Sequence, residues 1–106
     1  MKYNATMTTA ERIPMEVLDQ AASVLRVLAH PHRLRIVELL SDGPMVVSQL
    51  VKELGLAQNA VSQHLNFMKA HGILVSERQG RRVSYRVDNP HATTVLGCIR
   101  KHGGGR

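Results

Sequence analysis

The chain has few aromatic residues and a single cysteine. Its 106 residues include no Trp, two Tyr and one Phe, so the core must be built mainly from aliphatic side chains, which favours a helical domain. Cys98 stands alone and cannot form an intrachain disulfide, and nothing in the sequence indicates export to an oxidising compartment. We therefore expect a cytoplasmic protein that folds as one domain without structural disulfides.

The sequence also lacks long apolar runs and is short of acidic residues. No segment approaches the roughly 18 apolar residues of a membrane-spanning helix, and residues 1–14 contain no apolar signal-peptide core. Eight Asp and Glu stand against 14 Lys and Arg, which gives a formal net charge of +6. This balance predicts a polyanionic partner, with nucleic acid favoured over an anionic membrane.

Hydrophobic periodicity and helix-breaking residues divide the chain into helices and one hairpin. The predicted helices cover 14–29, 31–40, 46–54, 58–70 and 91–102. Strict alternation of apolar and polar residues predicts a β-hairpin over 73–87. This order, mainly α with a β-hairpin wing, is typical of a winged helix-turn-helix domain. We expect a flexible arm over 1–12, a DNA-binding and dimerisation domain over 13–102, and a flexible tail over 103–106.

The predicted helix over 58–70 has one apolar and one polar face. Val61, Leu65 and Met68 share the apolar face at helical spacing. The polar residues around the remaining surface are Gln58, Asn59, Ser62, Gln63, Asn66 and Lys69. Asn and Gln can pair with adenine edges through a donor and an acceptor, and Ser fits several bases. A merely solvated face would more often carry Glu and Lys; since this helix has no Glu, the sequence favours a DNA-reading helix.

The predicted hairpin is rich in arginine. Its basic residues are Arg78, Arg81, Arg82 and Arg86, with Glu77 as the one nearby acidic residue. Guanidinium groups on such a wing would hold phosphates or enter the minor groove of DNA. The alternative is a charged edge that only discourages the addition of further strands. The excess of positive charge favours the DNA-binding interpretation.

Two segments carry a resemblance to a known family. VLAHPHRLRIVELL at 27–40 and VSQLVKELGLAQNAVSQHLNFMKAHGILVSERQGRRVSYRV at 47–87 resemble the ArsR/SmtB family of bacterial winged-helix repressors, over about residues 15–102. The resemblance implies a homodimer joined by its first and last helices. It also implies an operator with dyad symmetry and release from DNA by an effector. The implied base-contacting positions are Gln58, Asn59, Ser62 and Gln63, with wing arginines on the DNA backbone.

The resemblance also bears on metal sensing. Many members use a cysteine pair whose matching positions here are Val46 and Ser48, neither of which can act as a thiolate. Cys98 is interpreted as an inert small hydrophobe, the alternative being an intersubunit disulfide.

The family's second metal site lies on the last helix. His91 and His102 match its two central positions, while Asn89 and Gly105 replace the outer ligands. A Zn²⁺ or other divalent ion shared across a dimer, with Asp88 as a third ligand, is therefore one hypothesis. The favoured interpretation is that these histidines lie on a dimerising helix without metal, so that no cofactor is firmly implied.

His64 is interpreted as a packed, hydrogen-bonded histidine rather than a ligand, and Arg33 is expected to point outward from the helix over 31–40. The chain shows no nucleophile–base pair, phosphate-cradling loop or paired carboxylates, so we do not expect an enzyme. A sequence-specific, dimeric repressor is the preferred function, and a winged-helix module that binds protein without specific DNA binding is the alternative.

Overall fold

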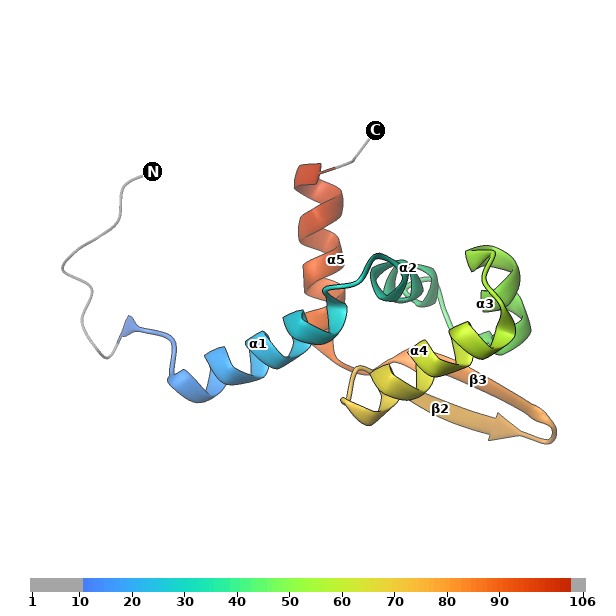
Figure 1. The fold of residues 1–106 in the computed structure, drawn as a ribbon. Helices are drawn as coiled ribbons and strands as arrows, with labels where there is room; N and C mark the ends of the chain where they lie inside the picture. Colours follow the sequence, from blue (N-terminus) through green and yellow to red (C-terminus); the bar gives the residue numbers. More distant parts are fainter. Residues whose placement is uncertain (1–10, 104–106) are drawn as a thin grey trace.

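The structure, a computed structural model, describes residues 11–103 (Figure 1). Within that range the elements are α1 (Met15–Leu28), α2 (Pro31–Leu40), β1 (Met45–Val46), α3 (Val47–Leu54), α4 (Gln58–Ala70), β2 (Leu74–Gln79), β3 (Arg82–Val87) and α5 (Pro90–Gly103). The predicted winged helix-turn-helix fold is confirmed. The arm and tail expected over 1–12 and 103–106 lie mostly outside the described residues; Gly103 still belongs to α5. No helix in the described range is long and apolar enough to cross a membrane.

The junction between α1 and α2 is fixed by a histidine and a proline. Extended backbone at His30 ends the first helical stretch, and Pro31 occupies the first position of α2, where its missing N–H costs nothing. The His30 Nδ1 atom accepts a hydrogen bond from the His32 backbone N–H at 3.1 Å. His30 therefore acts as the N-cap of α2.

The turn between α3 and α4 depends on Gly55. This residue ends α3 in the left-handed conformation, with φ +69° and ψ +27°, and its N–H donates to the Val51 carbonyl oxygen at 2.9 Å. A residue with a Cβ is strained in that conformation. Because only two residues, Leu56 and Ala57, separate Gly55 from α4, this one backbone conformation sets the direction in which α4 leaves the turn.

The sheet has one strand more than the sequence predicts. β2 and β3 form the expected antiparallel hairpin, and β1 adds to the far side of β3, giving the order β1-β3-β2. Met45 pairs with Tyr85 and Val46 with Ser84. The prediction that a helix begins at Val46 is therefore wrong by one residue. The strand stops there because the Gln49 side chain accepts a hydrogen bond from the Val46 N–H and starts α3.

The core is aliphatic, as the scarcity of aromatics predicts. Its fully buried side chains include Ile36, Val37, Leu50, Val61, Leu65, Met68, Ile73 and Leu74. They come from α2, α3, α4 and the start of β2. By contrast, only the last turns of α1 reach this core, and in Figure 1 the first part of α1 extends away from the body of the domain while α5 rises from it in another direction.

We expect the Gly55→Ala substitution to destabilise the domain by about 1–2 kcal/mol, because an L-residue is forced into left-handed backbone. Gly55→Asn should cost less, since Asn tolerates this conformation better. Urea unfolding of the three proteins measures the difference. Equal unfolding midpoints for the Ala variant and the unsubstituted protein would contradict the role assigned to Gly55.

Candidate nucleic-acid interface

α4 turns a polar face to solvent because its other face is wholly buried. Val61, Leu65 and Met68 are each 0% exposed. On the remaining surface, Ser62 is half-buried and five of the predicted DNA-binding residues are exposed: Gln58, Asn59, Gln63, Asn66 and Lys69. The helix carries no acidic residue. The structure thus gathers all six predicted residues of this helix on one element, outside the core.

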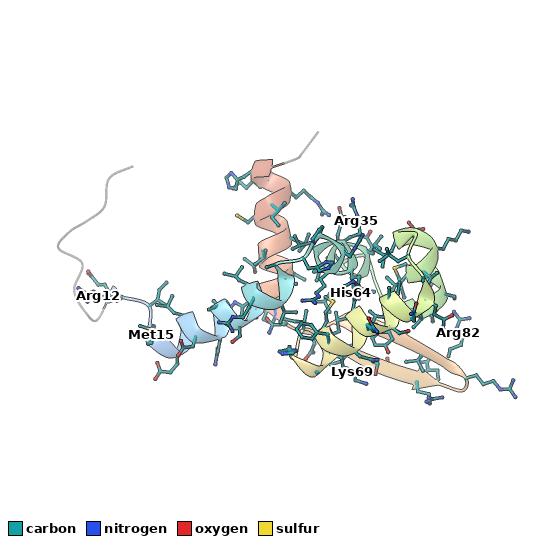
Figure 2. All side chains as sticks on the ribbon, in the orientation of Figure 1. Arg12, Met15, Arg35, His64, Lys69 and Arg82 are labelled. Carbon is teal, nitrogen blue, oxygen red and sulfur yellow. The ribbon has the colours of Figure 1, made fainter. Side chains whose placement is uncertain are left out.

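Lys69 connects α4 to the wing. Its Nζ donates a hydrogen bond to the Ser76 Oγ of β2 at 2.7 Å. Figure 2 shows Lys69 near the end of α4, on the side of the helix that faces the strands. The ammonium group is exposed and lies where α4 and the hairpin meet.

The four arginines of the wing are exposed, but they do not form a single stripe. In an antiparallel pair, directly opposed residues share a face of the sheet. Arg78 is opposite Val83, whereas Arg82 is opposite Gln79 and Arg86 opposite Val75. Because β2 and β3 alternate, Arg78 lies on the face that includes Leu74, while Arg82 and Arg86 lie on the other. Arg81 lies in the turn between the strands.

One of these arginines has an acidic partner other than Glu77. Arg86 forms an ion pair with Asp88, with 3.6 Å between Nη1 and Oδ1, and both side chains are about half exposed. The statement that Glu77 is the only nearby counter-charge is therefore wrong for Arg86. Since an exposed pair of this kind is weak, the Arg86 guanidinium can still exchange Asp88 for a phosphate.

Behind the polar face of α4, Arg33 joins three helices. Its Nε donates to the His64 Nδ1 at 3.4 Å, its Nη1 donates to the Val27 carbonyl oxygen at 3.0 Å, and its guanidinium carbon lies 4.2 Å from the centre of the Phe67 ring. The expectation that Arg33 points outward is wrong, because the end of α1 and α4 both offer it acceptors. The packing and the hydrogen bond expected of His64 are confirmed.

His64 belongs to a cluster of three histidines. The His30 and His64 ring centres are 4.7 Å apart, and the His32 ring centre lies 5.6 Å from that of His30 and 6.1 Å from that of His64. Burial, and then electrostatic repulsion by His30, Arg33 and His32, hold the pKa of His64 below its ordinary value. Sequence reasoning missed this cluster because residues 30 and 64 are far apart in the chain.

Of the residues considered for a metal site on the last helix, Asp88 has another partner, and Asn89 at the outer position caps the helix. The Asn89 Oδ1 accepts a hydrogen bond from the His91 N–H at 2.9 Å and caps α5, and Asp88 is paired with Arg86. The side chains of His91, His102 and Cys98 are exposed. Within one protomer, residues 88–103 therefore do not supply the four ligands of a sensor site.

The lowered pKa of His64 makes the stability of the fold depend on pH. As pH falls below the ordinary value of 6.5, the unfolded chain takes up this proton before the folded protein does, so the free energy of unfolding decreases. We expect a smaller decrease in His64→Gln, measured by urea unfolding in chelator between neutral and mildly acidic pH. His91→Gln, at an exposed position, serves as the control. Identical pH profiles for His64→Gln and the unsubstituted protein would contradict this role.

Comparison with known proteins shows the family. The helix-turn-helix model of bacterial regulatory proteins of the arsR family matches residues 30–76, which run from the α2 cap through α4 into β2. The HTH-type transcriptional repressor SmtB of Mycobacterium tuberculosis is 41% identical over 91 residues, covering 86% of this chain and 67% of that protein.

Solved structures agree with the fold. The transcriptional repressor BigR from Xylella fastidiosa matches with a TM-score of 0.81 and 27% identity, covering 94% of this chain and 100% of that one. The homodimeric winged helix-turn-helix DNA-binding domain of Mb0332 from Mycobacterium bovis matches with a TM-score of 0.71 and 26% identity, covering 92% and 88%. These matches confirm the predicted resemblance, and they are to regulators rather than enzymes. The chain belongs to the ArsR family of bacterial regulatory proteins.

Proposed function

We propose that this chain is a dimeric, sequence-specific DNA-binding repressor that an effector releases from its operator. The observation that supports the proposal most strongly is the exposed face of α4, which is rich in amide side chains and has no carboxylate. Such a face suits the negatively charged major groove, and a carboxylate there would be repelled by phosphates.

The amide side chains of α4 have the chemistry and the spacing for reading bases. Asn59, Gln63 and Asn66 are separated by four and three positions, which places neighbours on the same side of a helix. Each can donate one hydrogen bond and accept another from an adenine edge. Gln58 and Ser62 lie at the N-terminal part of the helix, the part that enters the groove first in helix-turn-helix proteins.

The wing supplies contacts that do not depend on sequence. Because Arg78 and Arg82 lie on opposite faces of the hairpin and Arg81 lies at its tip, the three guanidinium groups surround the end of the wing. Arg86 and Lys69 lie closer to its base. A wing with positive charge on both faces fits between the two phosphate chains that line a groove.

Dimerisation by α1 and α5 explains a second feature of the surface. Large apolar side chains are exposed on both helices. In and just before α1 they are Ile13, Met15, Val17, Leu18 and Leu25, and on α5 the residue is Ile99. These helices contact each other within the protomer, so their apolar residues can form one continuous interface. A two-fold dimer presents two copies of α4 and requires an operator with dyad symmetry. Such a repressor acts in the cytoplasm, where bacterial DNA lies.

A Zn²⁺ ion held across this dimer by His91 and His102 is one candidate for the effector, but the residues around the two histidines support it only weakly. Asn89 caps α5 and Asp88 is paired with Arg86, so the two histidines lack further ligands held beside them.

The other candidate function, a winged helix that binds only protein, would favour an acidic or apolar surface on α4, whereas the exposed surface carries amides and Lys69.

Base reading and backbone contact respond differently to substitution. We expect Gln63→Ala to weaken binding to the operator, selected from random duplexes, by about 1–3 kcal/mol and to leave binding to unrelated DNA nearly unchanged. Arg81→Ala should weaken both and reduce the salt dependence, because one phosphate contact is lost. Fluorescence anisotropy with labelled duplexes at several salt concentrations measures each effect.

Lys101→Ala is the matched control for charge, since Lys101 is exposed on α5 and its loss also removes one positive charge. It should leave operator binding unchanged. If Gln63→Ala loses affinity equally for operator and unrelated DNA, Gln63 does not read bases. Failure of the unsubstituted protein to prefer any duplex would favour the protein-binding module.

The dimer is tested by charge introduced on α1. Leu25, whose side chain is 52% exposed, should lie in the interface, and Leu25→Asp should shift the chain from dimer to monomer in light scattering coupled to gel filtration. Ser23→Asp is the control, because two positions along a helix bring the same charge to its other side. A dimer that survives Leu25→Asp and dissociates with Ser23→Asp would place the interface elsewhere.

A further inference from the structure

Three imidazole rings from separate parts of the chain converge behind the recognition helix. His30 precedes α2, His32 lies in its first turn and His64 lies midway along α4, and all three side chains are half-buried. Each offers a ring nitrogen, and these three atoms lie within 4.8 Å of one another. Figure 2 shows His64 in the region between α2 and α4. Among residues 11–103, this is the only group of three side chains with such metal-ligating atoms.

We propose that His30, His32 and His64 form a binding site for a late first-row divalent cation such as Zn²⁺. Imidazole nitrogen suits these ions, whereas Mg²⁺ and Ca²⁺ require oxygen ligands that the cluster does not offer. Zinc–nitrogen bonds of about 2.0–2.1 Å in tetrahedral geometry place the ligand nitrogens roughly 3.3 Å apart. From 4.8 Å, the rings must therefore approach by about 1.5 Å at most. The fourth position is left for water or an exchangeable ligand.

In the absence of metal, two of the rings use their lone pairs for hydrogen bonds. The His30 Nδ1 accepts from the His32 N–H, and the His64 Nδ1 accepts from the Arg33 Nε. A neutral imidazole has only one nitrogen with a free lone pair. A metal bound at Nδ1 displaces the His32 N–H and the Arg33 Nε directly. A metal bound at Nε2 moves the ring proton to Nδ1, which then can no longer accept a hydrogen bond. In both cases, metal binding ends the cap of α2 and releases Arg33 from His64.

Two positive charges act against the cation. The Arg33 guanidinium lies against His64, and the positive end of the α2 dipole points at the cluster. Both repel a divalent ion, so binding is reversible rather than structural. Hydrogen bonds already satisfy the His30 and His64 lone pairs, unlike those of a structural zinc site, which leaves its ligands unpaired when empty.

The position of the cluster links the metal to α4. His30 and His32 belong to the α1–α2 junction, and a metal would bind that junction directly to the recognition helix through His64. If α4 reads the operator, as the proposed function states, this connection couples metal binding to operator binding, so that each changes the affinity of the other. Metal binding itself is measured without DNA, so that failure of the site and failure of the proposed function are distinguishable.

The experiment titrates the full chain, freed of metal by a chelator, with Co²⁺ and records the visible absorption, which is far stronger for four-coordinate than for hydrated Co²⁺. Zn²⁺ affinity is then measured in competition with a chromophoric chelator. We expect His32→Ala to weaken binding about tenfold or more. This variant keeps both Nδ1 hydrogen bonds, because the bond to His30 comes from the backbone of residue 32. Urea unfolding in chelator verifies that it folds.

His71→Ala is the matched control, since His71 lies just after α4 and outside the cluster; it should bind Co²⁺ as the unsubstituted protein does. The double variant His91→Ala/His102→Ala should also bind normally. Absence of the Co²⁺ absorption, equal affinity in His32→Ala, or loss only in the α5 double variant would each overturn the proposal. Zn²⁺ should change operator affinity about fivefold or more in the unsubstituted protein and not in His32→Ala; an unchanged operator affinity despite metal binding would refute the link to α4.

Discussion

Burial of one face of α4 is the constraint on which the remaining structure depends. Val61, Leu65 and Met68 are completely removed from solvent, and each such side chain contributes about 1.5–3 kcal/mol relative to exposure. The helix cannot rotate about its axis without exposing them, so its amide-bearing side is held toward solvent. The left-handed backbone of Gly55 fixes how α4 leaves the preceding helix. Together, packing and turn geometry convert a sequence pattern into a preorganised polar surface, which is the one proposed to bind DNA.

Two further contacts attach α4 to its neighbouring elements. The hydrogen bond from Lys69 to Ser76 attaches the end of α4 to β2 of the wing. On the opposite side, Arg33 contacts the Val27 carbonyl, His64 and Phe67, and so joins α4 to the end of α1. Since α1 is also the proposed dimer helix, this contact joins the proposed DNA-reading helix to the proposed dimer interface. A ligand that displaces Arg33 would act on the connection between the two.

The parts of the structure that depend on local pattern could be predicted from the sequence, and the parts that depend on tertiary contacts could not. Periodicity locates α4 and the hairpin, and the polar residues of α4 lie where the helical projection places them. β1 has only two residues, Met45 and Val46, and no sequence period exists over so short a length. Arg33 is turned inward by acceptors on other helices. The three histidines meet only because the tertiary fold brings the start of α2 to the middle of α4, which no local spacing reveals.

The most direct test of base reading by α4 follows the side-chain amide resonances of ¹⁵N-labelled protein during titration with its selected operator. The account predicts large shifts for the Asn59, Gln63 and Asn66 amides, together with backbone shifts in the wing. The amides of Gln20 on α1 and Asn89, which caps α5, should remain unchanged. Shifts confined to α1 and α5, with the α4 amides unaffected at saturation, would contradict the central claim that this helix reads DNA.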